Sequence, residues 1–525
     1  MGCVSSSKHE GKQVFTYNES NGISSLDPAY SRNLENMWAV NQLFDGLVEL
    51  DSNLQVEPLI AESWDILDSG KRYVFRLRDD VYWHKSEHFG KDSTRKVVAG
   101  DFVYSFNRIL DPKTASPGKW VFDAIAPDGV RATDDRTLEI VLKDAFPPFL
   151  SMLSMQYCNV VPKEIVEHYG EDFRSNPIGC GPFKMAFWME NVALVYHKND
   201  GFWQKDSNGE GLPYLDAIKI DFVRDMSAEF TGLVKGQYDF MSGIHPAYKD
   251  ELLTPTGALN QGFDESIVFQ KTPFIKTDYI GILVDPDLAL SANHPLSDSK
   301  VRRALNHAIN RSQMVRYLRN NAVISADEGF IPKGLSGHRE NASYRYDYSI
   351  AKAKELLKEA GYENGEGLDK ITLSTTSDYV DLCEFLQFEW RKIGITCEIE
   401  VLAGASHREK VSKSQAQLFR KSWLADYPDA ENFLGLFYSE NFCPGGPNYT
   451  HFKSAQFDSL FVLSRKQKDL EKRTELYEKM DSLIMMEAPV IPLFYDQVSH
   501  FIRPEVTQFE TNAINMLDLK ETKKR

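Results

Sequence analysis

Short strand-like and helix-like segments alternate along all 525 residues, and no Gly-, Ser- or Pro-rich linker interrupts them. The clearest example is a strand expected at 371–374, a helix at 379–393 that Gly394 ends, and a strand at 396–401. This order favours a partly parallel sheet with a helix on its face. Because a chain this long exceeds one domain, the missing linker predicts α/β lobes joined by several short crossovers.

Apolar residues recur at helical spacing in several further stretches, and these set the expected helices. We expect one amphipathic helix over 300–319 and another helix over 34–50. Asp101 is expected to cap the start of a helix that runs to Leu110, because a side-chain oxygen there would satisfy free backbone N–H groups.

The charge balance argues against one large class of partner. The chain has 60 Lys and Arg against 76 Asp and Glu, a formal net charge of −16. A protein that reads a nucleic-acid backbone needs clustered basic residues, so no nucleic-acid partner is predicted. No stretch reaches the roughly 18 uninterrupted apolar residues of a membrane helix, so we expect a soluble chain. The aromatic share of 12% suits either a core or a ligand pocket.

Enzyme signatures are absent from the sequence. Gly179-Cys180-Gly181 lacks the third glycine of a dinucleotide loop and precedes a proline, so it indicates a turn. There is no G-x-S-x-G, Walker A or H-E-x-x-H motif. His84 and His88 are four residues apart but follow a strand-like run, so we interpret them as loop histidines. The sequence therefore predicts no catalytic residue, no metal ligand and no cofactor.

Six cysteines have spacings that match no zinc site, and most are expected to be buried thiols. They are Cys3, Cys158, Cys180, Cys383, Cys397 and Cys443. Three interpretations of Cys3 stay open on the terminus alone. It could be the lipid-bearing cysteine of a trimmed bacterial lipoprotein, part of a myristoylation pattern that begins at Gly2, or an incidental residue. No signal peptide is recognised before it.

The segment from Arg420 to Phe433 carries the most chemical information. It opens as a strand and breaks at Pro428. Trp423 and Asp426, near the strand end, would present an aromatic wall and a carboxylate together. A partly buried carboxylate needs a cationic or hydrogen-bonding partner, which a ligand could supply. The alternative is a solvated turn aspartate beside a core tryptophan.

Motifs in order along the chain resemble one known family, the family 5 extracytoplasmic solute-binding proteins of ABC importers. The matching stretches run from about residue 14 to about residue 510. They are Ala61-Glu-Ser-Trp64, Gly70-Lys-Arg-Tyr-Val-Phe-Arg-Leu-Arg78, Val81-Tyr-Trp-His84, Asp101-Phe-Val-Tyr-Ser105, Pro177-Ile-Gly-Cys-Gly-Pro-Phe183, Val301-Arg-Arg-Ala-Leu-Asn-His-Ala-Ile-Asn310, Tyr348-Ser-Ile-Ala-Lys-Ala-Lys-Glu-Leu-Leu357, the stretch from Trp423 to Phe433, and Glu487-Ala-Pro-Val-Ile-Pro492.

The resemblance implies a particular architecture. It is an α/β, two-lobed periplasmic-binding-protein fold of class II (cluster C), with an extra domain inserted in the first lobe. On this chain the first lobe would comprise 12–46, 176–272 and 492–525. The inserted domain would span 47–175 and the second lobe 273–491. The family closes its cleft between the lobes by hinge motion.

The resemblance also implies a function and a set of ligand-binding residues. The protein would capture a short peptide, deliver it to membrane permease subunits and catalyse nothing. Asp426 occupies the position that holds the peptide α-ammonium in a W-x-x-D motif, and a charge-assisted bond suits that role. Trp423, Ala425 and Tyr427 would flank the peptide, whose backbone would add to the strand. Arg420 matches an arginine that takes the carboxylate of a tripeptide.

One departure from the family pattern bears on cargo length. Dipeptide-binding members place an arginine after the strand equivalent to 371–374, whereas this chain has Thr375-Thr-Ser-Asp378. The departure favours a somewhat longer peptide. Other cargoes known in the family remain alternatives: a nickel complex, heme, an oligosaccharide or an opine. A carboxylate-dependent hydrolase is the rival from another class. The family tips Cys3 towards a lipid anchor on an extracytoplasmic, monomeric protein.

Overall fold

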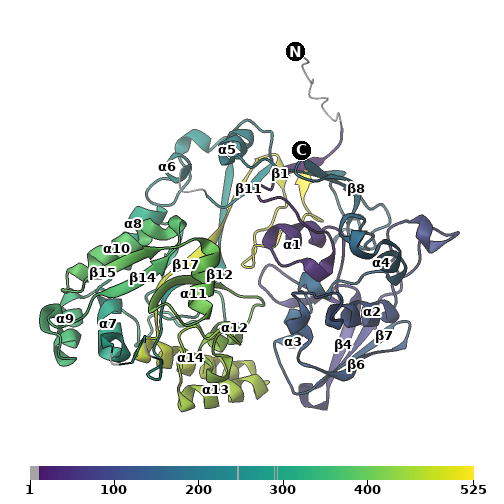
Figure 1. Cartoon of the computed structure of the whole chain (residues 1–525). Coiled ribbons are helices and arrows are strands. Elements are labelled where there is room, and N and C mark those ends of the chain that lie inside the picture. The colour runs from purple at the N-terminus through teal and green to yellow at the C-terminus, as the bar shows by residue number, and fades with distance from the viewer. Residues whose placement is uncertain (1–10, 245–247, 289, 293) are drawn as a thin grey trace. The chain divides into compact units, whose positions relative to one another are not determined.

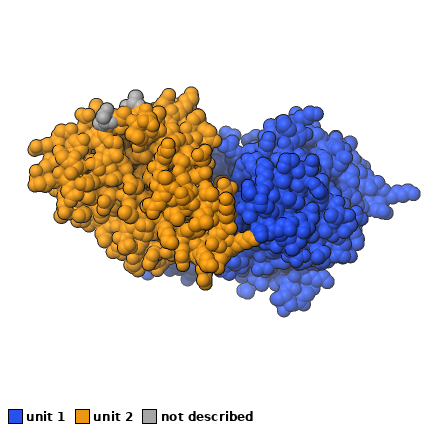
Figure 2. All heavy atoms as spheres, turned by 90° about the horizontal axis from the view of Figure 1, so that it is seen from below, with its two compact units in different colours: residues 1–245, 261–272, 498–525 blue, residues 246–260, 273–497 orange. Residues whose placement is uncertain are grey.

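The computed structural model describes residues 11–244, 248–288, 290–292 and 294–525 (Figure 1). The chain divides into two compact units, coloured separately in Figure 2. Unit 1 comprises residues 1–245, 261–272 and 498–525, and unit 2 comprises 246–260 and 273–497. The mixed α/β class expected from the sequence is confirmed. The separate inserted domain at 47–175 stays a prediction, because the division yields two bodies rather than three.

Unit 1 contains sheet strands in the order β11-β1-β10-β9-β8, and residues 500–502 at the end of β17 (Val490–Ile502), which also belong to this unit, pair with β11. Its strands are β1 (Val14–Asn18), β8 (Phe183–Met189), β9 (Ala193–Lys198), β10 (Ala217–Asp221) and β11 (Phe240–Ser242). β1 pairs in parallel with β10 and β11, and β9 pairs antiparallel with β8 and β10. Phe15 and Tyr17 are two residues apart on β1, so their side chains lie on the same face of the strand. There they pack with Trp38 and Phe240 in an aromatic core.

Smaller elements complete unit 1. A four-stranded sheet has the order β4-β5-β7-β6, and two pairs of short strands lie outside it. The strands are β2 (Val48–Leu50), β3 (Val56–Pro58), β4 (Ala61–Leu67), β5 (Arg72–Leu77), β6 (Ile125–Asp134), β7 (Thr137–Leu142), β18 (Val506–Thr507) and β19 (Lys523–Lys524). The helices are α1 (Leu34–Asn41), α2 (Ala99–Leu110), α3 (Phe149–Met152), α4 (Lys163–Tyr169) and α5 (Met226–Val234).

Two helix predictions in unit 1 need correction. The helix expected over 34–50 ends at Asn41, because distant segments take the backbone groups that would continue it: Leu43 O accepts from Gly181 N at 2.9 Å. Asp101 is not the cap of α2 but lies inside its first turn. Its carboxylate accepts a hydrogen bond from Val98 N at 3.0 Å. Asp101 therefore still satisfies a free backbone N–H at the start of the helix, but from the third helical position.

Unit 2 contains a mixed sheet in the order β15-β14-β16-β12-β17, to which β13 pairs through β17. The strands are β12 (Val268–Ile282), β13 (Ile324–Ser325), β14 (Ile371–Thr375), β15 (Cys397–Val401), β16 (Leu418–Leu424) and β17 (Val490–Ile502). The helices are α6 (Lys249–Leu252), α7 (Ser299–His307), α8 (Arg311–Arg319), α9 (Ile350–Glu359), α10 (Val380–Arg391), α11 (Gly404–Ser412), α12 (Glu431–Leu434), α13 (Ala455–Lys466) and α14 (Leu470–Glu487).

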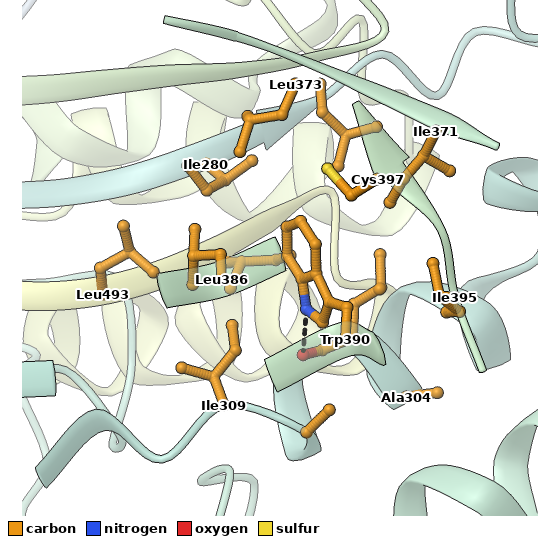
Figure 3. Packing of buried hydrophobic residues seen from close by; sticks show 14 of the residues in the cluster. Ile280, Ala304, Ile309, Ile371, Leu373, Leu386, Trp390, Ile395, Cys397 and Leu493 are labelled. Carbon is orange, nitrogen blue, oxygen red and sulfur yellow. Dashed lines mark hydrogen bonds between the residues drawn. The ribbon is translucent and has the colours of Figure 1, made fainter. Parts of the chain in front are cut away.

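The expected strand–helix–strand unit is confirmed. β14 and β15 pair in parallel, with Ile371 opposite Cys397, and α10 connects them. Figure 3 shows Trp390 of α10 among aliphatic side chains of this core, with its indole Nε1 donating to Leu305 O at 3.1 Å. That bond satisfies the polar edge of the largest core residue in the cluster.

The single helix expected over 300–319 is wrong, because the structure has α7 and α8 there, with a break between His307 and Arg311. Asn310 caps α8 by accepting from Gln313 N at 3.1 Å. Arg311 is buried and donates to Pro492 O at 2.7 Å, which requires a new helix direction. Among the described residues, no helix combines the length and apolar character needed to cross a membrane.

Candidate ligand-binding site

The end of β16 in unit 2 positions the residues predicted to bind ligand. β16 pairs antiparallel with β12 along its length, with Trp423 opposite Thr277. On its other side it meets β14 only at Leu418 and Phe419. Beyond Phe419, the described part of the chain supplies no strand for that edge of β16, although the His407 side chain occupies its first acceptor, with Nε2 2.9 Å from Arg420 O. An open edge of this kind offers backbone groups to an extended peptide.

Asn432, which the sequence analysis missed, joins two of the predicted residues. Trp423 Nε1 donates to Asn432 Oδ1 at 2.8 Å, and the same oxygen accepts from Asp426 N at 3.2 Å. Asn432 Nδ2 lies 3.4 Å from Asp426 Oδ2. Asn432 stands in α12, which begins just after the Pro428 turn, so the turn brings the amide back against the strand end. The three side chains form one hydrogen-bonded group.

The Asp426 carboxylate carries a charge that the protein leaves uncompensated. The residue is exposed, and within the described ranges no Lys, Arg or His nitrogen lies within 4.0 Å of its oxygens. Surrounding atoms partly desolvate the carboxyl group and raise the pKa of Asp426, while the Asn432 hydrogen bond acts in the opposite direction. Because the carboxylate is exposed and has no cation partner in the described part of the chain, it can accept a cation from a ligand.

Ala425 and Tyr427 are buried between these residues. Ala425 N donates to Ile275 O at 3.0 Å, which extends the pairing with β12 past the end of β16. The Tyr427 hydroxyl donates to the Glu431 carboxylate, and burial raises the pKa of both groups. Tyr427 is therefore anchored inward, where it supports the turn that carries Asp426.

Arg420 lies on the opposite face of β16 from Trp423, because the two are three residues apart on a strand. Its guanidinium forms an ion pair with Asp278, and its Cζ lies 3.2 Å from the centre of the Tyr379 ring. Burial lowers the pKa of Arg420 to about 9, against the opposing charge of Asp496, so it stays protonated at neutral pH. Asp278 and Tyr379 were not foreseen, since both are remote in sequence.

Other residues singled out in the sequence lie elsewhere. His84 is buried in unit 1, where Nδ1 accepts from Gly179 N at 3.2 Å and burial lowers its pKa to about 4. The five described cysteines are free and buried, as expected. Cys3 lies outside the described residues. Within those ranges, no group of three or more His, Cys, Asp or Glu is arranged to hold a metal.

Two hollows in unit 1 are lined by residues of that unit. One is lined by Asp45, Glu49 and Lys520, and the other by Asp27 and Arg108. Each hollow contains an internal ion pair, Lys520 with Glu49 in the first and Arg108 with Asp27 in the second, whereas Asp45 is buried and has no ion pair among the described residues. Neither places an exposed carboxylate like that of Asp426 at the end of a strand with an open edge, so the end of β16 is the stronger candidate.

Comparison with known proteins places the chain among binding proteins. The sequence model of the "Bacterial extracellular solute-binding proteins, family 5 Middle" matches residues 55–442. The chain belongs to family 5 of the bacterial extracellular solute-binding proteins, which confirms the resemblance seen in the sequence.

Individual relatives span nearly the whole chain. The dipeptide-binding protein of Escherichia coli is 28% identical over 90% of this chain and 87% of its own length. Heme-binding protein A of Haemophilus influenzae is 28% identical over 86% of this chain and 81% of its own length. The periplasmic binding protein DppA of Helicobacter pylori, solved with the peptide STSA, superposes with a TM-score of 0.77 at 25% identity, covering 97% of this chain and 98% of that one.

Proposed function

We propose that this protein is the extracytoplasmic substrate-binding component of an ABC importer, and that it captures short peptides by their amino terminus. The observation that carries the proposal is the Asp426 carboxylate, which is exposed, lacks a cation within the described residues and is oriented by Asn432. An α-ammonium bound there would make a charge-assisted hydrogen bond. The peptide-binding relatives in Escherichia coli and Helicobacter pylori support this cargo class.

The remaining predicted residues take supporting roles in the proposal. Trp423 is half-buried and would pack against the first residues of the peptide. The peptide backbone would add to the open edge of β16 beyond Phe419, so that binding would depend little on side-chain identity. Ala425 and Tyr427 would hold the turn in shape. Arg420, the predicted receptor for a tripeptide carboxylate, lies on the opposite face of β16 from Trp423, and Asp278 already compensates its charge.

Membership of the family supports the wider setting of the proposal. The protein would be exported, held at the membrane by a lipid on Cys3, and would act as a monomer that passes cargo to permease subunits. It would release the peptide unchanged, without catalysis. Chromatography of a peptide before and after incubation with the protein tests this last point, because hydrolysis would appear as shortened products.

The central experiment replaces Asp426 by Asn, which keeps the shape and removes the charge. The ligand is first identified by mass spectrometry of the protein as purified, and its affinity is then measured by titration calorimetry. We expect Asp426→Asn to weaken peptide binding by about 1.5–3 kcal/mol, the contribution of a hydrogen bond to a charged group. Asp287→Asn removes an exposed carboxylate of the same unit and should change nothing.

Two outcomes would contradict the proposal. Unchanged affinity in the Asp426→Asn variant would remove this carboxylate from the site. Recovery of heme, rather than peptide, from the purified protein would favour the cargo of the Haemophilus influenzae relative.

A further inference from the structure

Arg420 is part of a closed charge network in unit 2. Asp278 contacts Arg420 and also lies 3.3 Å from Lys276 Nζ, which in turn lies 2.6 Å from Asp496. Two cations and two carboxylates therefore balance each other. The Asp278 side chain is 1% exposed, so a ligand carboxylate that displaced it would leave a buried, unpaired charge. Arg420 is consequently a poor receptor for an anionic group of the cargo.

Lys421, the next residue along β16, differs from Arg420 because no carboxylate of the described residues compensates its charge. Its Nζ lies 4.1 Å from the centre of the Tyr449 ring, and no carboxylate oxygen of the described residues lies within 4.0 Å of it. Burial lowers the pKa of Lys421 to about 8, and the charges of Arg420 and Arg408 act in the same direction. It is still mostly protonated at neutral pH. The protein thus holds a desolvated cation without a counter-ion.

Arg408 adds a second uncompensated positive charge. It is exposed on α11, close enough for its charge to affect Lys421, and it too has no carboxylate within 4.0 Å in the described part of the chain. Like charges placed together without a counter-ion repel each other, which costs stability unless a bound anion compensates them. Lys421 also shares a strand face with Trp423, two residues on. Lys421 therefore lies on the face of β16 that carries Trp423 of the proposed peptide site.

The geometry points to Lys421, assisted by Arg408, as the receptor for a carboxylate of the cargo, in place of Arg420. This inference rests on the proposed peptide-binding function. It assigns the cargo a dipolar character, with an ammonium group at Asp426 and a carboxylate at Lys421. The carboxylate could be the peptide C-terminus or an acidic side chain, and the two sources have the same chemistry at the receptor.

The test uses one randomised tetrapeptide library in two forms, with a free C-terminal acid and with a C-terminal amide. Peptides retained by the full-length protein are quantified by mass spectrometry. We expect the native protein to retain free acids at least tenfold better than amides, or to retain Glu-containing amides at least tenfold better than their Gln counterparts. The first result identifies the C-terminus as the source, and the second identifies the side chain.

Variants then assign the preference to a residue. Lys421→Gln should reduce the preference for the carboxylate-bearing peptides below threefold, whereas Lys421→Arg should keep that preference. Lys413→Gln is the matched control, because Lys413 is exposed and already paired with Glu409 at 2.6 Å. Arg408→Gln should reduce the preference partly, and it serves as a second probe if the Lys421→Gln variant fails to fold.

The inference is overturned if the native protein retains acids and amides, and Glu and Gln peptides, equally well. It is also overturned if Lys421→Gln leaves the preference intact. Failure to retain any peptide form would instead overturn the proposed function on which the inference rests.

Discussion

The indole of Trp423 and the side chain of Asn432 are joined by a 2.8 Å hydrogen bond across nine residues of sequence. The acceptor oxygen of that bond also holds the backbone N–H of Asp426. One amide thus fixes both the aromatic wall and the carboxylate of the proposed site. Asn432 acts through these two residues, so it is a positioning residue.

Replacing Asn432 by Ala should weaken peptide binding about fivefold to tenfold, because one neutral hydrogen bond contributes about 1 kcal/mol. The pKa of Asp426 should rise in the same variant, since the Asn432 hydrogen bond lowers it. Calorimetry measures the first effect and carboxyl NMR titration the second. Asn432→Asp provides the contrast: it keeps the acceptor for Trp423 but puts a second negative charge beside Asp426. An unchanged pKa in both variants would refute the positioning role.

Asp481 should make unit 2 less stable as pH rises. It is fully buried in α14 and accepts from Phe330 N at 2.8 Å, and burial raises its pKa from the ordinary 3.8 of an aspartate to about 7. A carboxyl group whose pKa is raised by folding binds more protons in the folded state. Its contribution is therefore most favourable below about pH 4 and is lost as pH rises to about 7.

Asp481→Asn should remove this dependence while retaining the acceptor for Phe330. The difference in unfolding free energy between variant and native protein should grow by up to about 4 kcal/mol between pH 4 and pH 8, the upper limit for a three-unit shift. Urea denaturation at several pH values measures it. Asp287→Asn, which alters an exposed carboxylate, should show the same pH dependence of the unfolding free energy as the native protein. A pH-independent difference for Asp481→Asn would rule out this titration.

Trp390→Phe should destabilise unit 2 by about 1–3 kcal/mol. The substitution deletes the hydrogen bond to Leu305 O and leaves space in a core where Trp390 is fully buried. Phe388→Leu on the same helix is the control, because Phe388 is 57% exposed. Chemical denaturation compares the two. Equal losses in unfolding free energy for Trp390→Phe and Phe388→Leu would mean that the buried Trp390 contributes no more to stability than the exposed Phe388.

Dithiothreitol should leave the melting temperature unchanged. The five described cysteines are all free, so reduction has no bond among them to break. Burial also raises the pKa of the Cys383 and Cys397 thiols to about 11 and 12, which keeps both in the unreactive thiol form. Thermal unfolding with and without the reductant measures the effect. A lower melting temperature after reduction would indicate a disulfide.

Local signals in the sequence were sufficient for the strand–helix–strand unit around α10, because its apolar spacing and the Gly394 stop lie within one window. They failed at Arg311, whose buried guanidinium finds its acceptor at Pro492, 181 residues away, and so divides a continuous apolar pattern into two helices. The apolar spacing of 300–319 does not reveal a hydrogen bond to such a distant residue.

The candidate site shows the same limit. Trp423 and Asp426 were accessible from a short motif, whereas the compensation of Arg420 by Asp278 depends on a pairing across 142 residues. Asn432 was within reach: it follows the Pro428 turn six residues after Asp426, and a polar residue there could have been considered as a partner. Strand parity alone also separates Arg420 from Trp423.

The chain passes between the two units four times, at 245/246, 260/261, 272/273 and 497/498. This has a practical consequence for building chimaeras with relatives. A single contiguous exchange of 246–497 would also replace residues 261–272, which belong to unit 1. Those residues include the first part of β12. A hybrid with new cargo preference should therefore be made by two separate exchanges, 246–260 and 273–497, that keep the recipient's own stretch between them.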